Sequence, residues 1–125
     1  MGTRALIGLE RNDGTVISIS VNYDGYPEHC GQILNDCYSS TDKLAELIKH
    51  GNMSSISDKI SDCEFYVRDR DEEMDGNEAV EYDDAQKFIN SPYLKYYDHL
   101  YLFSEKAGLQ ILRGKELFPF QSLSD

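Results

Sequence analysis

The chain has 125 residues and carries 23 acidic side chains against 12 Lys and Arg, which gives a formal net charge of −11. Hydrophobic residues make up 40% and charged residues 28%, a balance typical of a folded protein, so we treat residues 1–125 as a single domain. The acid excess argues against direct binding of nucleic acid, which relies on Lys and Arg to neutralise phosphates, and no stretch reaches the roughly 18 apolar residues of a membrane span.

The first predicted element is a β-hairpin. Residues 3–9 and 16–23 are rich in aliphatic and β-branched side chains, and Asp13-Gly14 between them is typical of a hairpin turn. In the second run apolar and polar side chains alternate, which predicts one buried and one polar face. The two sets are Ile17, Ile19, Val21 and Tyr23 on one face, and Ser18, Ser20 and Asn22 on the other.

Two short helices are predicted next. Pro27 suits the first turn of a helix, because the N–H that proline lacks is not needed there. Apolar residues then recur at helical spacing, at Cys30, Ile33, Leu34, Cys37 and Tyr38. Thr41 is a candidate cap for a second helix with Leu44, Leu47 and Ile48 on its apolar face, and Gly51 is suited to end it. We expect the two helices to cover one side of the sheet.

The middle of the chain holds most of the acidity. Residues 58–84 contain twelve acidic and three basic side chains. Within this stretch, residues 65–67 read as a short edge strand and residues 69–77 as an exposed loop. No repeat or low-complexity tract marks a domain boundary.

The last third predicts a brief helix and a second hairpin. Ala85, Phe88 and Ile89 form a helical stripe, and residues 100–103 and 109–113 form two β-rich runs around a turn. The chain therefore predicts an α+β fold, a mostly antiparallel sheet of two hairpins with short helices packed on one face. Both hairpins should share one sheet, because an isolated hairpin is marginally stable at best. The predicted core includes Ile33, Leu34, Leu47, Ile48, Phe88 and Leu102.

Several of these segments together resemble a family of small proteins from bacteriophages and prophages. The similar segments are MGTRALIG at residues 1–8, the Asp13-Gly14 turn, the DGYP motif at residues 24–27, residues 47–55 and the hairpin at residues 101–103. The family would have His-Trp where this chain has Asn22-Tyr23, so no histidine chemistry is carried over to that position. The resemblance implies a phage context, and with it the cytoplasm of the host cell.

The turn from Asp24 to His29 is the candidate ligand site. It lies where a strand leads into a helix, a junction that gathers polar groups at one edge of a sheet. The candidate residues are Arg4, Tyr23, Asp24, Tyr26 and His29. Asp24 is a candidate ion-pair partner for Arg4. The alternative is that Asp-Gly-Tyr-Pro is ordinary turn chemistry, since Gly tolerates positive φ and Pro restricts φ.

The acidic segment is the candidate surface for a protein partner. Carboxylates spaced like phosphates would fit the basic groove of a host protein. The candidates are Asp69, Asp71, Glu72, Glu73, Asp75 and Glu78. The alternative is that the segment only keeps the protein soluble. Residues 71–82 match a calcium loop only in part, because Tyr82 stands where that loop needs a bidentate Glu.

The remaining patterns favour binding over catalysis. No phosphate-binding Gly loop, zinc motif or nucleophile motif is present, so we expect no metal and no cofactor. Cys30, Cys37 and Cys63 lack paired spacing and are predicted to be reduced, mostly buried thiols, as in a cytoplasmic protein. The sequence thus predicts a non-enzymatic acidic protein that binds a basic host protein, one that handles nucleic acid or acts in defence. The alternative is a small-ligand-binding protein or enzyme with its site at the turn from Asp24 to His29.

Overall fold

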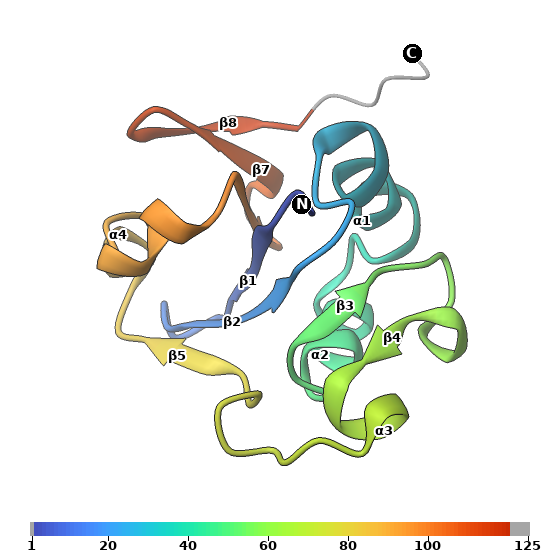
Figure 1. The fold of residues 1–125 in the computed structure, drawn as a ribbon. Coiled ribbons are helices and arrows are strands. Elements are labelled where there is room, and N and C mark those ends of the chain that lie inside the picture. The colour runs from blue at the N-terminus through green and yellow to red at the C-terminus, as the bar shows by residue number, and fades with distance from the viewer. Residues whose placement is uncertain (1, 121–125) are drawn as a thin grey trace.

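The computed structural model describes residues 2–120, which form an α+β fold around one eight-stranded, mostly antiparallel sheet (Figure 1). The strands are β1 (Ala5–Glu10), β2 (Val16–Val21), β3 (Met53–Ser55), β4 (Glu64–Phe65), β5 (Val80–Tyr82), β6 (His99–Ser104), β7 (Gly108–Arg113) and β8 (Glu116–Pro119). The α-helices are α1 (Gln32–Cys37), α2 (Thr41–Ile48), α3 (Tyr66–Arg70) and α4 (Ala85–Ile89). A π-helical turn spans Pro27–Gly31, and 3₁₀ turns span Ile60–Asp62 and Pro92–Tyr96.

Both predicted hairpins lie in this one sheet, as expected. The strand order is β4-β3-β2-β1-β6-β7-β8, and β5 pairs with β2. β1 pairs antiparallel with β2 and parallel with β6, so the first strand of one hairpin joins the first strand of the other. Within residues 2–120, no helix is long and apolar enough to cross a membrane.

Helices α1 and α2 cover one face of the sheet, as their apolar stripes predict. Leu34, Leu47 and Ile48 are at most 1% exposed and pack with Ile7 and Tyr101 of the central strands. Ile33 is only partly buried, at the margin of this cluster. The other predicted core residues, Phe88 and Leu102, are buried in a second cluster.

That second cluster lies on the opposite face of the sheet and includes side chains of α4, the brief helix predicted from its apolar stripe, and of the 3₁₀ turn that follows it. The prediction that Ser18 and Ser20 lie on an exposed polar face of β2 is wrong, because that face is buried: Ser18 is 1% and Ser20 is 6% exposed. The reason is that β5 pairs with β2 beside Ser18, and Tyr82 of β5 packs on this cluster. Tyr23, predicted on the buried face, is 51% exposed, because it lies beyond the end of β2.

Local hydrogen bonds move two further boundaries. The strand expected over residues 65–67 ends at Phe65, whose N–H donates to the Asp69 carboxylate, and helix α3 begins at Tyr66. Helix α2 is capped by Ser40 rather than Thr41, since the Ser40 hydroxyl accepts from the N–H of Lys43. Strands β3, β5 and β8 have only three or four residues each, too few for alternation to predict them.

Candidate functional site

The turn from Asp24 to His29 is held rigidly against the sheet. Asp24 has a φ of +58°, and the N–H of Gly25 donates to the Thr3 carbonyl at 2.9 Å. The Gly25 carbonyl accepts a 2.8 Å hydrogen bond from the buried hydroxyl of Tyr101. A Cβ atom on Gly25 would lie 2.8 Å from that of Ala5, so this position requires glycine. The turn chemistry predicted for Asp-Gly-Tyr-Pro is therefore present.

The five residues predicted for a ligand site at this turn do not converge. The Arg4 guanidinium donates to the side chain of Asn22 at 3.3 Å and lies over the Tyr97 ring at 4.9 Å. Among residues 2–120 it forms no ion pair with Asp24, which corrects that prediction. Tyr23 and Asp24 are exposed to solvent.

Tyr26 and His29 do lie near each other. Their rings are 6.0 Å apart, and Nε2 of His29 lies 3.3 Å from the carbonyl oxygen of Ile56. Tyr26 lines a groove between the π-helical segment and strands β6 to β8, and His29 does not, so the two residues do not share that groove.

A groove of about 680 Å³ opens beside the turn, between the π-helical segment and strands β6 to β8. Its apolar lining includes Tyr26, Pro27 and Phe118, and its charged or titratable lining is Glu28, His99 and Arg113. Burial lowers the pKa of His99; the carboxylates of Asp98 and Glu28 oppose this effect and Arg113 adds to it. We call this cavity the turn groove. Glu28, His99 and Arg113 are not among the site residues predicted from the sequence.

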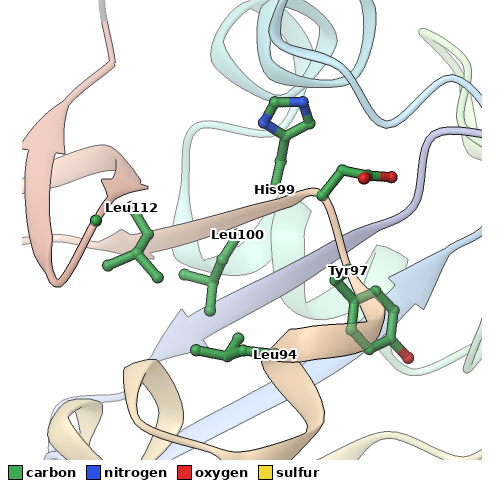
Figure 2. Close-up of a pocket in the computed structure, with 7 residues that line it drawn as sticks. Leu94, Tyr97, His99, Leu100 and Leu112 are labelled. Carbon is green, nitrogen blue, oxygen red and sulfur yellow. The ribbon is translucent and has the colours of Figure 1, made fainter.

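His99 also borders a smaller recess of about 230 Å³ (Figure 2). The view shows the His99 ring on one side of β6, with Leu94 and Leu100 on the other. Leu100 is buried, and Leu94 and Leu112 pack against the same cluster. Tyr97, Asp98 and Gly114 complete its lining, so the recess combines apolar side chains with polar groups.

The acidic loop, residues 71–78, carries five carboxylates that the structure leaves exposed. They belong to Asp71, Glu72, Glu73, Asp75 and Glu78. Within residues 2–120 none of the five forms an ion pair.

Asp69 differs from these five candidates. It pairs with Arg68 at 2.9 Å and accepts from the N–H of Phe65, and these contacts hold the pKa of its carboxyl below the usual value. Its carboxylate is therefore engaged at the start of helix α3.

The backbone of the acidic loop is anchored to the sheet by Asn52. The N–H of Asn52 donates to the Asn77 carbonyl at 2.8 Å, and its side-chain amide donates to the Gly76 carbonyl at 3.5 Å. Inside the loop, the Asn77 side chain donates to the Glu73 carbonyl at 2.9 Å. Figure 1 shows the loop running along one edge of the molecule from α3 to β5. The five carboxylates therefore project from a backbone with defined contacts.

A narrow groove of about 190 Å³ adjoins the acidic loop, and we call it the tyrosine groove. Tyr82, Tyr93 and Tyr97 line it, and Gly76 of the acidic loop forms part of its rim. Tyr82 lies between Glu81 and Asp83 in the sequence, but the pairing of β5 with β2, which the sequence does not predict, brings it to the same groove as Tyr93 and Tyr97. The structure thus places these tyrosines beside the backbone of the acidic loop at Gly76.

The three cysteines are free, and Cys30 and Cys63 are buried as predicted. Burial raises the pKa of the Cys30 thiol, which disfavours the nucleophilic thiolate. Cys63 lies 3.8 Å from the hydroxyl of Tyr38, which donates to the Ser57 carbonyl. Within the described part of the chain, no group of three or more His, Cys, Asp or Glu side chains is arranged to hold a metal ion.

Comparisons with family models, with curated proteins and with solved structures found no match to this chain.

Proposed function

We propose that the protein is a non-enzymatic acidic binding protein whose acidic loop docks on a basic surface of a partner protein. The partner class we propose is a host protein that handles nucleic acid or acts in defence, met in the cytoplasm of the host. The observation that carries this proposal is that five exposed carboxylates, which form no ion pair within residues 2–120, belong to a loop anchored by Asn52. A loop that is ordered before binding loses less conformational entropy when a partner docks.

The pattern of ion pairs around the loop supports this proposal. Nearby cations are engaged elsewhere: Arg70 pairs with Glu64, and Arg11 pairs with Glu81. After the loop in the sequence, Lys87 pairs with Asp83. Glu64, Glu81 and Asp83 are thus paired within the molecule, whereas within residues 2–120 no loop carboxylate forms an ion pair; Arg70 acts on Glu72 only through the electrostatic field. A surface of this kind attracts and orients a basic partner through its field.

The experiment that tests the proposal uses a fluorescein-labelled octalysine peptide as a defined basic probe. The loop variant Asp71→Asn, Glu72→Gln, Glu73→Gln, Asp75→Asn is compared with a matched variant, Asp58→Asn, Asp62→Asn, Glu105→Gln, Glu116→Gln. Both remove four charges from exposed positions. We expect the loop variant to weaken binding about tenfold at about 50 mM salt, and the matched variant to weaken it far less.

Equal losses in the two variants would mean that only net charge matters and would overturn the proposal. Absence of binding by the wild-type protein at low salt would also overturn it. A capture experiment from host lysate then tests the partner class. Proteins released as the salt rises to about 0.5 M should be basic and should not be retained by the loop variant.

A second candidate function is small-ligand binding in the turn groove. Its volume of about 680 Å³ falls within the range of small-molecule sites, roughly 300–1,000 Å³. Glu28, His99 and Arg113 supply polar contacts among aromatic and proline side chains. A fragment screen followed by NMR tests this candidate, which requires a ligand that shifts the signals of Tyr26, His99 and Arg113 together.

A further inference from the structure

We propose that the tyrosine groove takes the side chain of an arginine from the basic partner. This inference rests on the proposed function and names the residue type that the partner presents. The groove holds about 190 Å³, which suits one long side chain better than a whole small molecule, whose sites typically exceed about 300 Å³.

Two serines line the groove and supply hydroxyl oxygens that can accept a hydrogen bond from an occupant. Ser18 and Ser20 line it and are 1% and 6% exposed, and within residues 2–120 their hydroxyls make no hydrogen bond. Within residues 2–120 every fully buried side-chain nitrogen or oxygen atom has a partner, so these two hydroxyl oxygens are open to the groove, where they can accept from an N–H group.

Other buried serines of the protein are satisfied. Ser91 accepts from the N–H of Tyr93 at 3.2 Å, and Ser104 accepts from the N–H of Ala107 at 3.0 Å. Ser54 accepts from Arg70 at 3.4 Å. The open hydroxyls of Ser18 and Ser20 therefore set the tyrosine groove apart.

The aromatic lining favours a guanidinium group. Tyr93 is 60% exposed, so one side of its ring is free for a ligand. Tyr97, which also lines the groove, already holds the Arg4 guanidinium over its ring at 4.9 Å. Arginine stacks on tyrosine and is more weakly hydrated than lysine, so it loses less on entering a narrow groove. Val80, 49% exposed, offers apolar surface for the aliphatic stem of the side chain.

The charge at the rim selects a cationic occupant. Gly76 forms part of the rim, and its sequence neighbour Asp75 is one of the five exposed carboxylates. A guanidinium that enters the groove would therefore place its charge beside this acid, while other basic residues of the partner face the rest of the acidic loop.

The test compares two fluorescein-labelled peptides of equal charge, one of alternating Gly and Arg and one of alternating Gly and Lys. We expect the wild-type protein to bind the Arg peptide about tenfold more tightly. Tyr93→Ala and Ser18→Ala should abolish this preference and leave the binding of the Lys peptide unchanged. Tyr96→Ala, at a position 57% exposed and outside the groove lining, is the matched control and should keep the preference.

The outcomes separate the two proposals. If the wild-type protein binds neither peptide, the proposed function fails and the arginine site fails with it. If it binds both equally, the acidic loop stands and the arginine site is overturned. The site is also overturned if the Arg preference survives in Tyr93→Ala. Tyr93 is exposed, so this variant should fold, and misfolding would not explain a loss of the preference.

Discussion

The side-chain oxygen of Asn52 accepts a 2.9 Å hydrogen bond from the backbone N–H of Ser20. On this edge β2 pairs with β3 at Val21 and with β5 from Val16 to Ser18, so Asn52 occupies the position that neither strand covers. The backbone N–H and the side-chain NH₂ of Asn52 donate to the acidic loop at Asn77 and Gly76, and its carbonyl accepts from the N–H of Tyr66. One residue thus links the sheet edge to the surface for which we propose a function.

Asn52→Ala should lower the free energy of unfolding by about 1–3 kcal/mol, because the N–H of Ser20 loses its acceptor. The variant should also bind octalysine more weakly, since the loop loses one of its anchors. Urea denaturation measures the first effect and peptide titration the second. Asn12→Ala, in the exposed turn after β1, is the control. A change for Asn52→Ala no larger than the control's would contradict this role.

Tyr101→Phe should destabilise the protein by about 1–3 kcal/mol. The substitution removes the buried hydroxyl that donates to the Gly25 carbonyl and leaves that carbonyl without its partner. Tyr96→Phe, at an exposed position, should change stability by less than about 0.5 kcal/mol. Thermal and urea unfolding of both variants checks the prediction, and equal small effects would show that the turn does not depend on Tyr101.

Leu34→Ala should cost about 2–5 kcal/mol, because Leu34 is 1% exposed and packs in the larger core cluster. Ile33→Ala should cost clearly less, since Ile33 lies at the margin of that cluster. The comparison uses urea denaturation of the two variants side by side. A loss below about 0.5 kcal/mol for Leu34→Ala would place this face of α1 in solvent.

The free energy of unfolding should decrease as the pH falls from about 8 to about 5.5. Burial lowers the pKa of His50 and of His99 in the folded protein, so the unfolded chain binds more protons as the pH falls through about 6.5. The double variant His50→Gln, His99→Gln should show a flatter dependence in this window. Denaturation curves at several pH values measure the slope, and equal slopes for variant and wild type would refute the assignment.

The elements predictable from sequence are those with enough residues to show a period. The β1–β2 hairpin, α2 and the β6–β7 hairpin each have clear alternation or a clear apolar stripe, and each is present. Strand β5 has three residues in an acidic context, so neither propensity nor alternation indicates it. Its absence from the prediction also explains the error over Ser18, which β5 helps to bury.

The candidate sites were predictable only as segments. Unpaired acids in the loop follow from composition, because the stretch has too few cations to neutralise them. The anchoring by Asn52 depends on contacts between segments far apart in the chain, and so does the groove that Ser18 and Tyr93 both line. Arg4 shows the same limit, since the carboxylate predicted as its ion-pair partner, Asp24, is replaced in the structure by Asn22 and Tyr97.

An NMR titration of the ¹⁵N-labelled protein with the alternating Gly and Arg peptide tests the central claim most directly. We predict that the largest shifts fall on the acidic loop, residues 71–78, and on Ser18, Ser20 and Tyr93. The shifts should shrink as salt rises toward about 0.5 M, because screening weakens the attraction between the acids and the peptide. Shifts centred on Tyr26, His99 and Arg113 in the turn groove, or shifts that leave the acidic loop unaffected, would contradict the account.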